Sequence, residues 1–289
     1  MSRHATFRKL IQQPEILVAP GTYDALGARI IEQTGFNALY LTGAGVAYSL
    51  LGRPDIGLVT MTEMVERART VCDAVSIPVI ADADTGFGNS LNTYRTVREY
   101  EKAGVSCIQL EDQVMPKRCG HMSGKQLVPV NEMVSKIHAA CDARQDSDFC
   151  IMARTDAIAV EGFEQALARA AAYREAGADL LFIEAPQSED MMRNLCAQFR
   201  DVPLLANMVE GGKTPLKTAA ELQELGYSVV IFPGAIARVV SKAVSEFMAH
   251  LYKAGTTRDY LDHMFIFDEL NTILGLKEMR DREQRYARS

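Results

Sequence analysis

Short runs of apolar residues recur along the chain, and each run is closed by polar residues or by glycine. Eight such runs occupy residues 16–21, 38–45, 77–86, 106–112, 149–156, 180–186, 203–208 and 228–234. Continuous apolar runs of this kind are typical of strands that are buried on both faces of a parallel sheet. The pattern therefore predicts eight parallel strands.

Stretches with apolar residues at steps of three and four lie between these runs and predict amphipathic helices. They cover residues 23–36, 62–75, 92–105, 131–143, 164–179 and 219–228, and several end in Ala-Gly or a single Gly, which is a C-cap signal. Strands that alternate with helices over about 250 residues predict a (β/α)8 barrel. A doubly wound open sheet is the alternative, but eight parallel units in one domain favour closure.

The chain from residue 256 onward follows a different pattern, which is helical and carries apolar side chains that a finished barrel could not bury. We expect residues 1–255 to form the catalytic barrel and residues 256–289 to form a helical arm. The arm could pack on its own barrel. Its apolar content favours the other interpretation, in which it packs on a neighbouring subunit of a homo-oligomer.

Composition and charge exclude several classes of function. The chain has 289 residues, 48% hydrophobic and 24% charged, and a net charge of −6, which leaves no basic surface for nucleic acid. No apolar run approaches the ~20 residues of a membrane span, and the N-terminus lacks the features of a secretory signal. The six cysteines form no C-x-x-C pair. We therefore expect a cytoplasmic protein with reduced thiols and no membrane partner.

The ends of the predicted strands carry an unusual number of polar and charged residues. In barrels of this type the active site forms at the carboxyl ends of the strands. Burying such charges without partners would cost several kcal/mol each, so a common ligand is expected to join them. The strand-end residues are Thr42, Gly43, Asp82, Asp84, Glu111, Asp112, Arg154, Asp156, Glu184 and Asn207.

The run "ADADTGFGN" (81–89) is the most informative of these strand ends. Asp82 and Asp84 are two residues apart, so on a strand both would face the same side. With Glu111 from the next strand they would form a site of hard oxygen ligands. Mg²⁺ fits such a site because it keeps several waters and takes one or two carboxylates, and Mn²⁺ is possible.

Two further strand ends could bind a carboxylate. The backbone N–H groups of "LTGAG" (41–45) could hold one, although a plain glycine turn explains this sequence equally well. Arg154 could form a bidentate pair with a carboxylate, or an ion pair with Glu111 or Glu184, and both can hold together.

Two long segments between strands predict functional loops. The first contains Asp55. The second is "QVMPKRCGHMSGK" (113–125), in which Cys119 lies near Lys117, Arg118 and His121. Nearby cations lower the pKa of a thiol, so Cys119 could accept or donate a proton near neutral pH. The other five cysteines are expected to be packing thiols.

With these motifs together, the chain resembles the isocitrate lyase/phosphoenolpyruvate mutase superfamily over essentially its whole length. The resemblance is carried by "TGAGV", "PDIG", "ADADTGFGN", "LEDQVMPKRCGH", "MARTDA" and "ANMVEGGKTP". It is strongest to the short branch that includes methylisocitrate lyases, 2,3-dimethylmalate lyases and carboxyphosphonoenolpyruvate mutases. The resemblance implies an α/β barrel that forms tetramers and exchanges a C-terminal helix between subunits.

The resemblance also implies a Mg²⁺ site. Asp84 would bind the metal directly, and Asp55, Asp82 and Glu111 would hold metal-bound waters.

The remaining site residues are carried over in the same way. Thr42, Gly43 and Ala44 would bind the substrate carboxylate, and Arg154 would balance its charge. Tyr40, Glu184 and Asn207 would line the pocket. Cys119 would be the general acid/base of the loop, with Lys117 and His121 as further catalytic groups and Gly120 beside the substrate. Either Tyr40 or a metal-bound water could take the substrate's hydroxyl proton.

The implied activity is cleavage of a carbon–carbon bond in a substituted 2-hydroxy di- or tricarboxylate, of the 2,3-dimethylmalate or 2-methylisocitrate type, which releases pyruvate. Three alternatives stay open: oxaloacetate decarboxylation or hydrolysis, phosphonomutase chemistry, and a barrel that only binds metal. Met122 stands where methylisocitrate lyases tend to have arginine, and "FPGAIA" (232–237) lacks their usual serine. These departures favour a substituted malate over a tricarboxylate.

Overall fold

The computed structural model describes residues 1–120 and 122–287. Contacts divide the chain into two compact units, Met1–Ile236 and Ala237–Ser289, which are described separately. No helix in the described part of the chain combines the length and apolar character needed to cross a bilayer.

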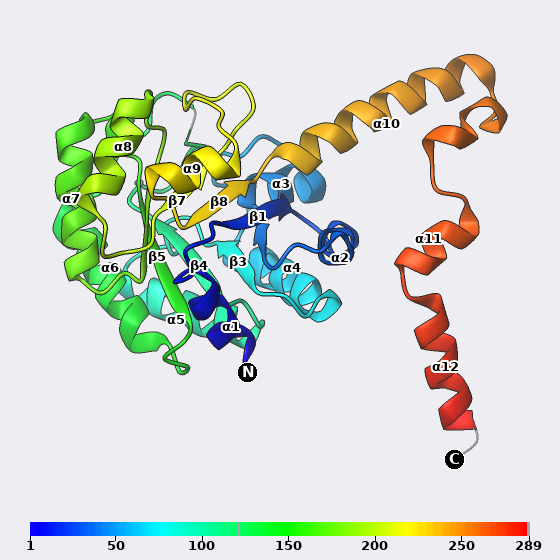
Figure 1. Ribbon diagram of the computed structural model, residues 1–289, viewed down its shortest axis with the longest axis horizontal. Helices are drawn as coiled ribbons and strands as arrows, with labels where there is room; N and C mark the ends of the chain where they lie inside the picture. Colours follow the sequence, from blue (N-terminus) through cyan, green and yellow to red (C-terminus); the bar gives the residue numbers. More distant parts are fainter. Residues whose placement is uncertain (121, 288–289) are drawn as a thin grey trace. The chain divides into compact units, whose positions relative to one another are not determined.

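Eight parallel strands form the sheet of the first unit (Figure 1). They are β1 (Leu17–Thr22), β2 (Leu39–Leu41), β3 (Val79–Asp82), β4 (Cys107–Glu111), β5 (Cys150–Thr155), β6 (Leu180–Ile183), β7 (Leu205–Asn207) and β8 (Val229–Phe232). Their order is β6-β5-β4-β3-β2-β1-β8-β7, with β1 paired to β8 from Leu17 opposite Val229. The strands at the two ends of this order, β6 and β7, are also joined, through a parallel bridge between Leu181 of β6 and Leu204, the residue before β7. The predicted (β/α)8 barrel is therefore confirmed, and the open sheet is excluded.

Helices alternate with these strands and surround the barrel. They are α1 (Arg3–Leu10), α2 (Ala25–Thr34), α3 (Gly43–Val46), α4 (Met61–Ala74), α5 (Ser90–Lys102), α6 (Val130–Ala143), α7 (Phe163–Glu175), α8 (Glu189–Gln198) and α9 (Ala219–Leu225), with the π-helix Ala47–Leu51 and the 3-10 turn Ala157–Ala159. All six predicted helices are present, whereas periodicity did not predict α1, α3 and α8. Gly35 and Gly226 end α2 and α9 at φ values of 103° and 110°, as the C-cap signal predicted.

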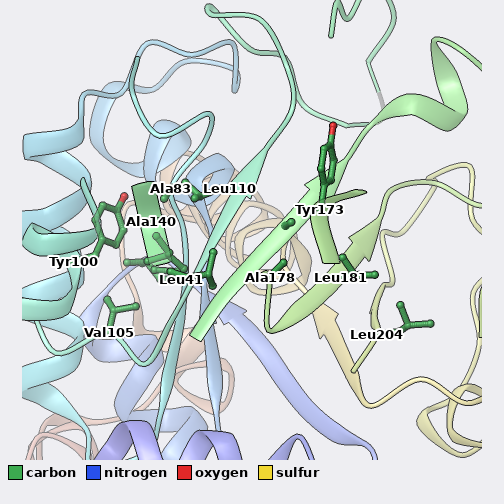
Figure 2. Packing of buried hydrophobic residues seen from close by; sticks show 14 of the residues in the cluster. Leu41, Ala83, Tyr100, Val105, Leu110, Ala140, Tyr173, Ala178, Leu181 and Leu204 are labelled. Carbon is green, nitrogen blue, oxygen red and sulfur yellow. The ribbon is translucent and has the colours of Figure 1, made fainter. Parts of the chain in front are cut away.

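The core of the first unit has two layers. One lies between the sheet and the helices, where Tyr100 of α5 and Tyr173 of α7 pack with strand residues such as Leu41 and Leu110 (Figure 2). The other fills the barrel itself and is closed by Phe7 of α1. The barrel is thus a packed interior, which leaves its carboxyl-terminal mouth for a functional site.

Two buried tyrosines connect the outer helices to the strand ends. The Tyr100 hydroxyl donates to the carbonyl oxygen of Asp82 at 3.0 Å, and the Tyr173 hydroxyl donates to Oδ2 of Asp112 at 2.8 Å. Buried phenols need such partners, so these bonds fix helices α5 and α7 against the mouth of the barrel.

The second unit is helical. It contains most of α10 (Ala235–Ala254), then the 3-10 segment Arg258–His263, α11 (Phe267–Ile273) and α12 (Leu276–Ala287). The ring of Tyr260 contacts the rings of Phe247, His250 and His263 at centroid distances of 5.1, 5.0 and 4.9 Å. The contacts with Phe247 and His250 hold the 3-10 segment against α10, whereas His263 belongs to the segment itself.

We predict that Tyr100→Phe lowers the free energy of unfolding by about 1 kcal/mol, because it leaves the buried Asp82 carbonyl without its donor. Tyr94→Phe, at an exposed position of the same helix, is the matched control and should have no effect. Urea denaturation followed by circular dichroism measures both. Equal stability of the two variants would contradict the inferred role of this bond.

Candidate active site

Four predicted metal-site carboxylates gather around one buried ammonium group at the barrel mouth. Nζ of Lys117 lies 2.7 Å from the Asp55 carboxylate and 3.0 Å from Oδ1 of Asp84. Burial lowers the pKa of Lys117, but Asp84, Asp82, Asp55 and Glu111 outweigh burial and raise this pKa well above its usual value. Lys117 is therefore a permanent cation, and the residues that the sequence assigned to a metal site do lie together.

Asp84 lies just after β3, and its backbone differs from the expected one. The strand ends at Asp82, and Asp84 adopts a left-handed conformation with φ of 46°. The spacing of two residues had predicted that strand alternation turns both side chains to the same side. This prediction does not hold, because Asp84 is not part of the strand. Instead, the Asp84 N–H donates to Oδ1 of Asp82 at 3.1 Å, and the Asp84 carbonyl accepts from the Glu111 N–H at 2.8 Å. Such backbone strain is typical of functional positions.

The environment of Asp84 raises the pKa of its carboxyl group to about 7. Burial is the main cause; Lys117 opposes it, and the neighbouring Asp82 and Asp55 add to it. A buried carboxyl group that is costly to ionise is one that a divalent cation would stabilise.

Gln109 is a site residue that the sequence analysis missed. Its amide donates to Oδ1 of Asp82 at 3.3 Å, and its carbonyl accepts from the Tyr40 hydroxyl at 2.7 Å. Burial, and then the charge of Asp82, raise the pKa of Tyr40 well above its usual value. Tyr40 is therefore a neutral phenol that donates a hydrogen bond. In the sequence, Gln109 is only a single amide within an apolar run, which does not by itself indicate a functional residue.

The predicted carboxylate-binding turn forms the start of α3. The side chain of Thr42 caps this helix by accepting from the Gly45 N–H at 3.3 Å. Gly43 lies so close to Asp82 that a Cβ atom there would be 2.8 Å from the Asp82 carboxylate. The backbone at Gly43 therefore adjoins the acidic cluster, and a larger residue at this position would displace the Asp82 carboxylate.

Arg154 connects three carboxylates on the other side of the mouth. Its guanidinium lies 3.4 Å from Glu111, 3.3 Å from Glu184 and 3.0 Å from Asp156, and stacks 5.0 Å from the ring of Phe182. Both ion-pair partners considered for Arg154 in the sequence analysis are thus present.

Glu184 also reaches the next strand. The Asn207 amide donates to Oε2 of Glu184 at 3.1 Å. Oδ1 of Asn207 is buried and has no hydrogen-bond partner within the described residues. A buried acceptor of this kind is suited to a ligand or an ordered water.

The loop 113–125 lies over these strand ends. Gly120 is packed so tightly that a Cβ atom would be 2.8 Å from Glu184 and would overlap with the Arg154 guanidinium. The N–H of Cys119 donates to the carbonyl of Asp55 at 3.3 Å, and Cys119 is half-buried. The loop thus brings Cys119 to the mouth of the barrel. His121, the remaining predicted loop residue, lies outside the described part of the chain.

The thiols of Cys72, Cys107, Cys150 and Cys196 are buried, and burial raises the pKa of each. For Cys150 and Cys196 the raised value is about 12. The fifth other cysteine, Cys141, is half-buried, and its pKa is also raised, mainly by burial. These environments suit packing thiols.

The carboxylates of the acidic cluster are oxygen donors of the kind that Mg²⁺ takes. In the described part of the chain no group of three or more His, Cys, Asp or Glu side chains that could hold a metal ion is found. Mg²⁺ does not need one, because it is usually held by one or two carboxylates and keeps several waters. Oε1 of Glu111 is buried without a hydrogen-bond partner among the described residues, which leaves an acceptor for such a water.

Known proteins resemble this chain along its whole length. A family model described as phosphoenolpyruvate phosphomutase matches residues 7–252. The 2,3-dimethylmalate lyase of Eubacterium barkeri is 51% identical over 287 residues, which are 99% of each chain.

Two solved structures add information on ligands. One, of an oxaloacetate acetylhydrolase with 3,3-difluorooxalacetate, has a TM-score of 0.94 and 35% identity, and the match covers 99% of this chain and 97% of that one. The other, of a phosphonopyruvate hydrolase with oxalate and Mg²⁺, has a TM-score of 0.90 and 32% identity, and the match covers 99% and 100%.

Proposed function

Because the chain belongs to the phosphoenolpyruvate phosphomutase family, we propose that it is a carbon–carbon lyase that cleaves a substituted malate of the 2,3-dimethylmalate type. The main support is the position of the Cys119 loop, which packs on Arg154 and Glu184. In addition, the chain is 51% identical to a 2,3-dimethylmalate lyase. The products would be pyruvate and a simple carboxylate.

The substrate would lie between the acidic cluster and the arginine. Arg154 would pair with one substrate carboxylate. Burial lowers the pKa of Arg154, but Asp156, Glu111 and Glu184 outweigh burial and raise this pKa, so the guanidinium stays charged. The backbone at Thr42, Gly43 and Ala44 would hold the same or the second carboxylate. Glu184 and Asn207 would line the pocket beside them.

The reaction would be a retro-aldol cleavage. The hydroxyl at C2 loses its proton, the C2–C3 bond breaks, and its electron pair moves to C3 while C2 becomes the carbonyl carbon of pyruvate. Cys119 would deliver a proton to C3, so that one proton is lost and one gained. The loop would shield the carbanion from water.

The protonation states of the site restrict the roles of its other groups. Tyr40 is held as a phenol, so we assign it hydrogen bonding rather than the role of base for the substrate hydroxyl. Lys117 is held as an ammonium, so it would act through its charge. We keep His121 as a further candidate of the same loop.

We further propose Mg²⁺, or Mn²⁺, as the cofactor. Asp84 would bind it directly, and Asp55, Asp82 and Glu111 would hold its waters. When bound, the ion would stabilise negative charge on the substrate's hydroxyl and carboxylate oxygens. Support comes from the buried Glu111 oxygen without a partner among the described residues and from the related hydrolase structure with oxalate and Mg²⁺.

Oxaloacetate hydrolysis is a second candidate function. The similarity to an oxaloacetate acetylhydrolase favours it, because the structure of that protein in complex with 3,3-difluorooxalacetate matches 99% of this chain at a TM-score of 0.94. The two reactions differ in product: the lyase releases pyruvate, whereas hydrolysis of oxaloacetate releases oxalate and acetate.

We predict that the purified protein with Mg²⁺ releases pyruvate from 2,3-dimethylmalate. A coupled assay for pyruvate would be run with 2,3-dimethylmalate, 2-methylisocitrate, citramalate and oxaloacetate, glyoxylate would be measured with isocitrate, and oxalate would be measured in parallel. Oxalate from oxaloacetate alone would establish the second candidate. Absence of turnover on every hydroxy acid would refute the proposed lyase and leave phosphonate chemistry to be tested.

We predict that Cys119→Ser lowers kcat of the lyase by at least about 100-fold, because a hydroxyl is a far weaker acid than a thiol in this role. Oxalate binding in the presence of Mg²⁺, measured by calorimetry, should persist. The matched control is Cys141→Ser, since Cys141 is also half-buried and lies on α6, away from the loop. Near-normal turnover of Cys119→Ser would remove Cys119 from the proton transfer.

We also propose that the second unit packs against another copy of the chain in a cytoplasmic homotetramer. Support comes from large apolar side chains that are exposed on this unit, which soluble monomers rarely gather. They are Val239, Val244, Met248, Tyr252, Phe265 and Phe267.

Removal of residues 256–289 should therefore lower the molecular mass in light scattering to that of a smaller assembly. The circular dichroism spectrum serves as the control that the barrel remains folded. An unchanged oligomer from a folded, truncated chain would contradict the packing role of the arm.

A further inference from the structure

Asp156 follows the end of β5, and its buried carboxylate joins Arg154 to the stem of the Cys119 loop. Oδ2 accepts from Nε of Arg154 at 3.0 Å and from the Gln113 amide at 3.2 Å. Oδ1 accepts from Nη2 of Arg154 at 3.1 Å and from Nζ of Lys125 at 2.7 Å. Each carboxylate oxygen therefore binds the arginine on one side and the loop stem on the other.

The two loop residues continue these contacts to both neighbours of Cys119. Lys125 donates a second hydrogen bond to the carbonyl of Gly120. Gln113 donates to the carbonyl of Arg118 at 2.8 Å and accepts from the Arg118 N–H at 3.0 Å. Arg118 and Gly120, the two neighbours of Cys119, are therefore each connected to the Asp156 carboxylate through one side chain, that of Gln113 or of Lys125.

On the other side, Asp156 determines how the guanidinium of Arg154 is turned. It occupies the edge formed by Nε and Nη2. In this orientation Nη1 lies 3.4 Å from Glu111 and Nη2 lies 3.3 Å from Glu184, while Cζ lies over the ring of Phe182. Since the guanidinium fork is rigid, fixing one edge fixes the direction of the other donors.

Asp156 is itself firmly held. Its N–H donates to Oδ1 of Asp112 at 3.0 Å, and Oδ2 of Asp112 accepts from Thr155 at 2.7 Å and Tyr173 at 2.8 Å. Burial would raise the pKa of Asp156, but Arg154 and Lys125 outweigh it and lower this pKa to about 2. The carboxylate is therefore an anion throughout the working pH range of a protein.

We propose that Asp156 is a positioning residue that sets Arg154 and the Cys119 loop together, so that the orientation of the substrate-binding arginine and the position of the loop depend on one carboxylate. The roles of Arg154 and Cys119 rest on the proposed lyase function, whereas the contacts themselves do not. Loss of the Asp156 charge should therefore release both sides, and loss of Lys125 should release the loop alone.

Two variants separate these effects. Lys125→Met keeps the fork between Arg154 and Asp156, so kcat should fall by about 100-fold through misplacement of the loop, with little change in KM. Asp156→Asn should lower kcat at least as far and also raise KM and the Kd of oxalate. The double variant should lose no more than Asp156→Asn alone, because residues that act as one unit are not additive.

Amide hydrogen exchange of the peptides that span residues 113–125 gives a readout that does not depend on activity. Exchange of the loop should be faster in both variants than in the wild-type protein. The matched control is Asp179→Asn: Asp179 precedes β6 and also holds two arginines, Arg8 at 3.0 Å and Arg144 at 2.8 Å. This control should lower stability without accelerating exchange of the loop.

The outcomes distinguish failure of this proposal from failure of the proposed function. Unchanged loop exchange in folded Asp156→Asn and Lys125→Met, or equal acceleration in Asp179→Asn, would overturn the positioning role. Should Asp156→Asn not fold, Lys125→Met decides by the same measurement. A wild-type protein that cleaves none of the hydroxy acids would refute the lyase, while loop exchange and oxalate binding would still test Asp156.

Discussion

Burial of charge at the mouth of the barrel is the constraint on which the rest of the site depends. Six carboxylates there lie almost out of contact with water and unpaired would be very costly to ionise: those of Asp55, Asp82, Asp84, Glu111, Asp156 and Glu184. Three buried cations compensate for part of this charge: Lys117, Arg154 and Lys125. The arrangement is tolerable only when cations and anions are in place together.

Two of those three cations come from the loop 113–125 rather than from the barrel. Lys117 pairs with Asp55 and Asp84, and Lys125 pairs with Asp156. Movement of the loop away from the mouth would therefore leave carboxylates unpaired on both sides of the site. The electrostatic balance of the site therefore depends on the position of the loop. This dependence explains why a segment so rich in glycine and cations packs closely on Arg154 and Glu184.

The sequence was sufficient for the parts of the fold that follow from periodicity and chain direction. Buried parallel strands have continuous apolar runs, and their carboxyl ends share one mouth, so Asp82, Glu111, Arg154 and Glu184 could be placed together before any coordinates. Asp84 could not be oriented in this way, because its left-handed backbone breaks the alternation that the argument assumed.

Gln109 and Asp156 had weaker signals for different reasons. One polar residue within an apolar run does not reveal its partners, and those of Gln109 come from two other strands, through Tyr40 and Asp82. Asp156 was visible at a strand end, two residues from Arg154, but its link to Lys125 depends on how a long loop folds back.

The protonation states of the site follow from the same buried charges. Burial and neighbouring charges keep Tyr40 neutral and Lys117 protonated. The proposed lyase therefore leaves the transfer of the proton to the half-buried Cys119, beside these fixed charges.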